Sequence, residues 1–210
     1  ASTPAATEAT TAPTEAPATE ATEAPTETNE APTEPPVVYR NPLNGEVLDE
    51  PYTGRIFAVT ISNIRDALPH YGTMEADILM EMWVNGSIIR DLALYTDVSK
   101  AEAIGSVRSD RLMFNQIVKM YDAVLADAAG SDQVLNDAKN TGVNRMTIDT
   151  GDSTDYAYRA KDRVFTFKPE SKYEHTLFAK GAGLLDFAQK KGFSVTQPAD
   201  KEYNLHFTED

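Results

Sequence analysis

Residues 1–36 contain no apolar side chain larger than that of Ala, and this confines a folded core to the rest of the chain. The segment consists of ten Ala, ten Thr, seven Pro, seven Glu, one Ser and one Asn. Such a composition cannot bury enough surface to offset the entropy lost on ordering. We therefore expect residues 1–36 to be a disordered stalk and residues 37–210 to form one domain, which is long enough for a hydrophobic core.

The stalk repeats a short Ala-Pro-Thr-Glu unit at residues 12–15, 24–27 and 31–34. Proline at this density favours extended conformations, and spaced glutamates repel one another, so the segment suits a semi-stiff spacer. Thr/Pro-rich stalks hold exported domains away from a surface. The chain begins at Ala1 without Met, which fits a removed signal peptide. We expect an extracytoplasmic, surface-tethered protein.

Charge and composition argue against several classes of protein. The chain has 33 acidic and 19 basic residues and no basic run, so nucleic acid is not an expected partner. It has no apolar run near 18 residues, which argues against a membrane-spanning segment in these 210 residues. It also has no Cys, which excludes disulfides, zinc-thiolate sites and thiol nucleophiles.

Two strand signals dominate the first half of the domain. Residues 56–61 form a short, almost wholly apolar run that indicates a strand buried on both faces. Residues 77–84 and 87–96 resemble two strands around Asn85-Gly86, a pair that favours a type I′ hairpin. A two-residue turn at this position predicts that Glu81 lies directly opposite Arg90.

Apolar spacing predicts helices at residues 110–120, 132–139 and 176–190, with Ser109 as the N-cap of the first. Residues 122–126 and 143–148 resemble further strands, and shorter alternations occur at 165–167 and 203–207. The expected fold class is α/β or α+β. It is a layered mixed β-sheet that contains the hairpin, with helices packed on both of its faces.

The most suggestive candidate site lies in residues 104–111, which read Ile-Gly-Ser-Val-Arg-Ser-Asp-Arg. Arg108 and Arg111 flank the expected helix start at Ser109, where guanidinium groups and free backbone N–H groups suit an anion. Arg90, Arg108, Ser109 and Arg111 are therefore the candidate anion-binding residues. Asp110 is a weak candidate metal ligand. The alternative is that the arginines merely pair with neighbouring acids.

Other catalytic signals are weak. The three histidines share no metal-ligand spacing, and we interpret His175 as a surface or capping residue. No hydrolase elbow, phosphate-binding loop or dinucleotide fingerprint occurs. Asp77, Glu81 and Arg90 share one expected strand face, and a structural network is the preferred interpretation of that cluster. No catalytic residue is assigned.

Several short motifs together resemble the N-terminal domain, of unknown function, of the YerB-like family of bacterial lipoproteins. They are Asn41-Pro-Leu-Asn-Gly-Glu46, Ala76-Asp-Ile78 with Glu81, Gly86 through Arg90, Val107-Arg-Ser109 with Arg111, Tyr121-Asp-Ala123 and Gly130-Ser131. The resemblance implies a lipid-anchored envelope protein with a second, C-terminal domain beyond the chain given. The anchor would be a lipidated cysteine just ahead of the stalk, which this chain does not include.

The leading hypothesis is a membrane-anchored envelope domain that binds a partner protein or an anionic cell-wall component without catalysis and without a cofactor. The chain also resembles, more distantly, enzymes that transfer lipid-linked glycopolymers to the cell wall. The resemblance lies in an expected strand that carries Arg90 and in the later Arg-Ser-x-Arg sequence at residues 108–111. On that alternative the chain is a metal-assisted phosphotransferase with Mg²⁺ on Asp77 or Asp110. A third hypothesis is a purely structural domain.

Deletion of residues 1–36 tests the stalk. We expect the thermal midpoint of the shortened protein to stay within about 1 °C of that of the full chain, because a segment without apolar side chains buries nothing on folding. Parallel thermal melts followed by circular dichroism measure this. A clear loss of stability on deletion would contradict the prediction.

Overall fold

A computed structural model describes residues 37–162, 166 and 172–198 of the chain. The stalk at 1–36, most of the alternation at 165–167 and all of that at 203–207 lie outside the described residues. The mixed α/β class predicted from the sequence is confirmed.

A five-stranded mixed sheet forms the centre of the fold, in the order β4-β5-β3-β7-β8. β3 pairs antiparallel with β5 and parallel with β7, and β8 continues the parallel half. All six residues of β3 are buried, as expected from its continuous apolar run. The strands are β3 (Phe57–Ser62), β4 (Ile78–Asn85), β5 (Ile88–Tyr95), β7 (Val124–Asp127) and β8 (Asn144–Thr147).

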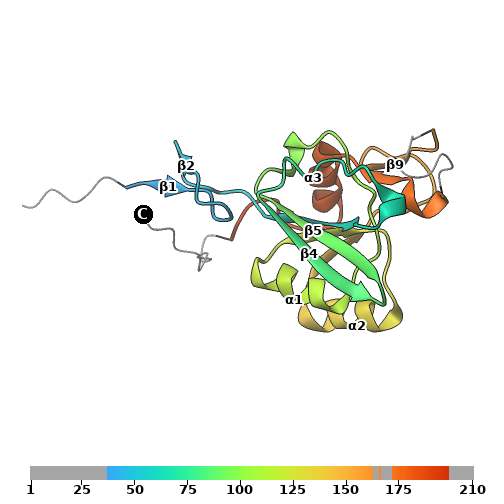
Figure 1. Cartoon of the computed structure of the whole chain (residues 1–210). Coiled ribbons are helices and arrows are strands. Elements are labelled where there is room, and N and C mark those ends of the chain that lie inside the picture. The colour runs from blue at the N-terminus through green and yellow to red at the C-terminus, as the bar shows by residue number, and fades with distance from the viewer. Residues whose placement is uncertain (1–36, 163–165, 167–171, 199–210) are drawn as a thin grey trace, which may run out of the picture. The chain divides into compact units, whose positions relative to one another are not determined.

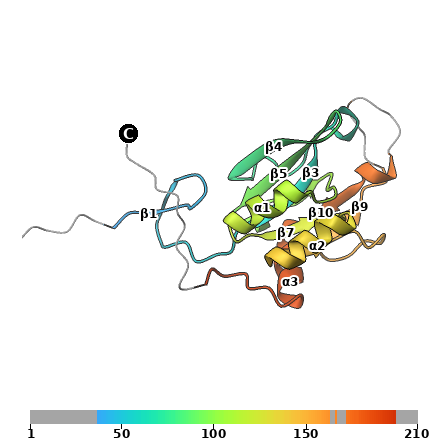
Figure 2. The same cartoon turned by 90° about the horizontal axis from the view of Figure 1, so that it is seen from below.

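Helices cover both faces of this sheet, as predicted. Figures 1 and 2 show α1 and α2 side by side on one face and α3 on the opposite face. One apolar cluster joins the sheet to α1 and the other joins it to α3. The helices are α1 (Leu112–Met120), α2 (Asp132–Thr141) and α3 (Gly181–Lys190), with short 3-10 helices at Arg65–Ala67, Val98–Lys100 and Tyr173–His175. Within the described part of the chain, no helix has the length and apolar character needed to cross a membrane.

The predicted helix at residues 176–190 is wrong in its first third. Leu177–Ala179 form β10, the middle strand of a small antiparallel sheet in the order β6-β10-β9. All three residues of β10 are buried, so strand pairing on both sides overrides the helical spacing of Leu177 and Phe178. The remaining strands are β1 (Tyr39–Arg40), β2 (Val47–Leu48), β6 (Ile104–Gly105) and β9 (Ala157–Arg159).

The β4–β5 hairpin is confirmed, but its predicted register is wrong by one residue. The turn consists of Gly86 and Ser87, because Asn85 pairs with Ile88. The register then shifts between Trp83 and Asn85, so that Val84 is an extra residue on β4. As a result Glu81 faces Asp91, and Arg90 faces Met82 on the other side of the sheet.

The chain between β6 and α1 runs extended beside the central strands instead of starting the helix at Asp110. The N–H of Arg108 donates to the carbonyl of Thr60, and the carbonyl of Arg108 accepts from the N–H of Ala128. The N–H of Asp110 donates to the carbonyl of Ala129. These bonds keep the backbone extended as far as Arg111, the N-cap of α1, so the prediction that Ser109 caps this helix is wrong.

Buried charges hold this extended segment in place. Arg145 on β8 lies 2.6 Å from the Asp127 carboxylate and 3.7 Å from that of Asp110, and both aspartates are fully buried. Burial raises the pKa of Asp110 to about 6 and raises that of Asp127 well above its ordinary value. The Arg145 guanidinium opposes both shifts, so this one cation favours the ionised form of two buried carboxylates.

Substitution of Gly86 tests the hairpin turn. Gly86 has a φ of +52°, and no atom lies within 4 Å of the position that a Cβ would occupy. Gly86→Val should therefore lower the free energy of unfolding by about 1–2 kcal/mol through backbone strain alone. Gly86→Asn is the matched control, because Asn tolerates positive φ. Equal stability of both variants in urea unfolding would refute the turn.

Removal of Arg145 tests the buried network through pH. The raised pKa of Asp110 means that its contribution to stability is present below its unfolded pKa, near 4, and is lost as pH rises through about 6. Arg145→Leu strands both carboxylates, so we expect a loss of about 3–5 kcal/mol at pH 8 and a smaller loss at pH 5. Urea unfolding at the two pH values measures this, with the exposed Arg65→Leu as control. A loss independent of pH would contradict the network.

Candidate anion-binding site

Arg90 is the innermost of the predicted site residues. It lies on the sheet face that α1 covers, only 3% exposed, between Met82 of β4 and Ser62 of β3. Its Nη1 donates to the carbonyl of Ser109, while its Nε is buried with no hydrogen-bond acceptor among the described residues. This acceptor is a neutral carbonyl, so the charge of Arg90 is not neutralised by the bond.

Arg108 and Arg111 lie on the extended segment that also carries Ser109. The Arg108 side chain is 24% exposed, donates from Nη1 to the carbonyl of Glu174 at 3.0 Å and approaches the Glu174 carboxylate at 3.8 Å. Arg111 donates from Nη1 to the carbonyl of Asp110 at 2.7 Å. Among the described residues, no carboxylate forms an ion pair with Arg90 or Arg111.

The three guanidinium groups are close enough to perturb one another. Burial, together with the positive charges of Arg111 and Arg108, lowers the pKa of Arg90 to about 10, and the Asp110 carboxylate opposes this shift. The pKa of Arg111 is lowered by burial and then by Arg108. The structure therefore brings the predicted arginines close enough together for their positive charges to repel one another.

A surface cavity of about 600 Å³ opens beside this cluster. Ser109 and Arg111 line it, whereas Arg90 and Arg108 do not. Its other wall is the start of α2, where Ser131 is the N-cap and accepts a bond from the N–H of Val134. The first N–H groups of a helix lack intrahelical acceptors and carry partial positive charge. The full lining is Val84, Asn85, Ser109, Arg111, Leu112, Met113, Ala129, Gly130, Ser131, Gln133 and Val134.

The two candidate metal ligands lie apart and have other partners. Asp110 is paired with Arg145 in the buried network. Asp77 precedes β4 at the opposite end of the hairpin, where its carboxylate accepts from Asn41 at 2.7 Å, from Asn44 at 2.8 Å and from the N–H of Thr96 at 2.6 Å. Across the part of the chain that the structure describes, no three His, Asp or Glu side chains are grouped to hold a metal ion.

The predicted cluster of Asp77, Glu81 and Arg90 is also wrong, because the register shift separates them. Glu81 instead accepts a hydrogen bond from the amide of Asn63, which also donates to Asp91 at 3.0 Å. Burial raises the pKa of Asp91, and His70 lies 3.8 Å from its carboxylate. This second polar cluster has no signal in the sequence, since it depends on the observed register.

His175 is buried, not at the surface as expected. It ends the 3-10 helix before β10, and only 1% of the residue is exposed. Burial lowers its pKa, so the imidazole is uncharged at neutral pH. The prediction of a surface residue fails because the helix assigned to this segment is absent.

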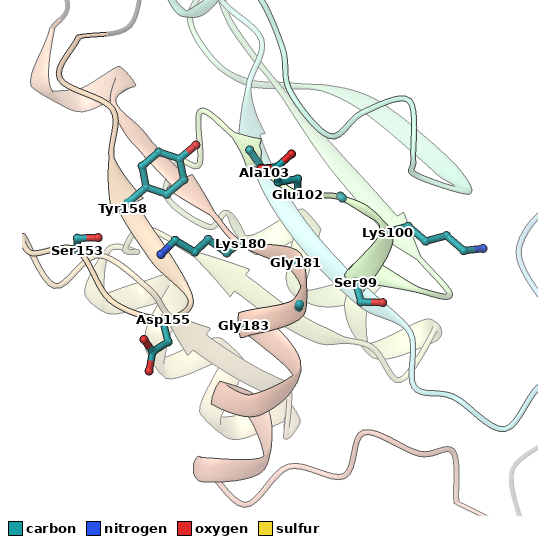
Figure 3. Close-up of a pocket in the computed structure, with 12 residues that line it drawn as sticks. Ser99, Lys100, Glu102, Ala103, Ser153, Asp155, Tyr158, Lys180, Gly181 and Gly183 are labelled. Atoms are coloured by element: carbon teal, nitrogen blue, oxygen red, sulfur yellow. The ribbon is translucent and has the colours of Figure 1, made fainter.

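A second cavity, of about 710 Å³, lies at the start of α3 and was missed by the sequence reasoning (Figure 3). The signal for it is the Gly181-Ala-Gly183 run, since a Cβ at Gly183 would lie 2.2 Å from the carbonyl oxygen of Asp155. Figure 3 shows the side chains of Lys100 and Lys180 extending in opposite directions. Lys180 donates to the carbonyl of Thr154 at 2.9 Å. Because Glu102 and Asp155 also line it, this cavity suits an anion less than the first.

Comparison with known proteins agrees with the fold. A Bacillus subtilis (strain 168) protein named "Putative lipoprotein YerB" is 26% identical over 181 residues, covering 78% of this chain and 51% of that protein. The crystal structure of YerB protein from Bacillus subtilis matches with a TM-score of 0.65 at 24% identity, covering 75% of this chain and 51% of that chain. The chain thus spans about half the length of these relatives.

A family match places the whole site inside one domain. Residues 43–194 match the family described as "Protein of unknown function (DUF3048) N-terminal domain". This range contains β3 to α3, the three arginines and both cavities. The chain belongs to the DUF3048 N-terminal domain family.

Proposed function

We propose that this domain binds a phosphate-bearing anionic ligand of the cell envelope at Arg90, Arg108 and Arg111, without catalysis. The observation that carries the proposal is the proximity of three guanidinium groups. Arg108 and Arg111 lower the pKa of Arg90, and the carboxylate that opposes this shift, that of Asp110, is shared with Arg145. Guanidinium forks and backbone N–H groups are the donors that bind phosphate oxygens.

The energetic cost of this arrangement supports a ligand. Bringing like charges together while partly removing them from water is unfavourable. The carboxylate that attracts both Arg90 and Arg111 is that of Asp110, and it is shared with a fourth arginine, Arg145. A bound anion would offset both the repulsion and the lost hydration, so the cluster is suited to binding rather than to stability.

The envelope location rests on the relative and on the stalk. The matching Bacillus protein is named as a lipoprotein, and residues 1–36 have the composition of a spacer. On this proposal a lipid anchor outside the given sequence holds the domain at the outer face of the membrane. Anionic wall components, membrane lipids and an acidic surface of a partner protein all carry the chemistry that the arginines recognise.

The two alternatives from the sequence receive less support. A metal-assisted phosphotransferase needs a carboxylate beside the arginines that is free to hold Mg²⁺, and Asp110 is already paired with Arg145. A purely structural domain requires the arginines to be buried against carboxylates. Arg108 is partly exposed, and the Glu174 carboxylate that it approaches is half exposed, so this pair is not buried.

Titration with pyrophosphate tests the proposal. The full chain should bind pyrophosphate in calorimetry, more weakly as salt rises from about 50 to 200 mM. Arg111→Gln should weaken binding at least about tenfold, because it removes a charged donor. Arg108→Ala should weaken binding while changing the unfolding midpoint little, since a partly exposed ion pair contributes little to folding.

The exposed Arg65→Gln is the matched control and should bind as the parent protein does. If the parent protein binds no pyrophosphate with or without Mg²⁺, the anion site is refuted. If binding requires Mg²⁺, the phosphotransferase hypothesis regains support. If Arg108→Ala unfolds the domain, the arginines are structural.

A further inference from the structure

We infer that the ligand of this site is a lipid phosphate, that is, a phosphate monoester on an aliphatic chain, held in the cavity between the hairpin tip, α1 and α2. The inference rests on the proposed function and adds the substrate class. The phosphate would lie at Arg111 and the start of α2, and the chain would lie against the apolar side chains of the same cavity.

The size of the cavity argues against a bare inorganic anion. At about 600 Å³ it falls within the range of sites that enclose small organic molecules, about 300–1,000 Å³. A phosphate ion has only five heavy atoms and would leave most of this space to water. The cavity is therefore matched to a ligand with a body as well as a charged group.

The lining supplies apolar surface from three separate elements. Val84 comes from the tip of β4, Leu112 and Met113 from the first turn of α1, and Val134 from the first turn of α2. All but Val134 are only partly buried. An aliphatic chain would remove this remaining surface from water, which a sugar or a polyanion would do less well.

The charge in the cavity has one sign. Among the described residues that line it, Arg111 is the one charged side chain, and no carboxylate is present. The chain as a whole has a net charge of −14, so a cavity lined by one arginine and no carboxylate differs from the rest of the surface and favours an anion. The cavity at the start of α3 provides the contrast, because lysines and carboxylates line it together. A single cationic position among apolar and uncharged polar side chains is complementary to an amphiphile with one anionic head.

A homologous series of ligands measures the effect of the chain. We expect the Kd of the full protein for inorganic phosphate, ethyl, butyl, hexyl and octyl phosphate to fall about fourfold per added methylene, from about 0.8 kcal/mol for each one buried. The gain should stop once the cavity is filled. Calorimetry below the micelle concentration of each ligand gives these values.

Two variants on one helix separate the apolar wall from the charge. Met113→Ser should flatten the dependence on chain length and leave the affinity for inorganic phosphate unchanged. Met120→Ser is the matched control, because Met120 is 75% exposed on the same helix and does not line the cavity. If Met113→Ser proves unstable in a thermal melt, Val84→Ser at the hairpin tip provides the same test from another element.

The outcomes distinguish this inference from the proposed function. Binding of phosphate or pyrophosphate with no dependence on chain length overturns the lipid and leaves the anion site standing. No binding of any member of the series overturns both. Equal binding of octyl phosphate and uncharged octanol, or unchanged octyl phosphate binding in Arg111→Gln, overturns the assignment of the head group to Arg111.

Discussion

The extended backbone of residues 106–110 is the constraint on which the site depends. It is hydrogen-bonded to β3 on one side and to the residues after β7 on the other, and it thereby fills the space where these two parallel strands end. The Arg145 salt bridges fix its last residue, Asp110, in the interior. In this position Ser109 presents its carbonyl to Arg90, and Arg108 and Arg111 lie near enough to Arg90 to lower its pKa.

The strands and helices that could be predicted are those that are indicated by residues within the same short segment. β3 follows from a run of apolar residues, and α2 follows from Ser131 and the turn before it, because a side-chain cap acts within one turn of helix. β10 could not be found in this way. Leu177 and Phe178 have helical spacing to the residues that follow them, and only pairing with β6 and β9 makes them a strand. Those partners are distant in the sequence, and the spacing of one segment carries no information about them.

The sequence indicates which charged residues form the candidate site, but it does not indicate the cavity beside them. Two arginines around a serine suggested an anion site, and the structure does place them beside Arg90. The predicted helix start is wrong, because Ser109 does not cap α1 and the helix start that lines the cavity belongs to α2. The cavity itself joins the hairpin tip, α1 and α2, and no pattern within any one of these segments predicts that they meet.

The extra residue at Val84 decides what Arg90 can do. In the predicted register Arg90 would face Glu81, and two opposite charges on neighbouring strands would neutralise each other. The bulge shifts the pairing of β4 with β5 by one residue from Trp83 to the start of β4. Asp91 therefore lies opposite Glu81, and Arg90 lies on the other face of the sheet. Arg90 is thereby separated from Glu81 and donates its hydrogen bond to the carbonyl of Ser109. One inserted residue thus separates Arg90 from Glu81 and leaves it near Arg108 and Arg111, which is the electrostatic condition on which the proposed anion site rests.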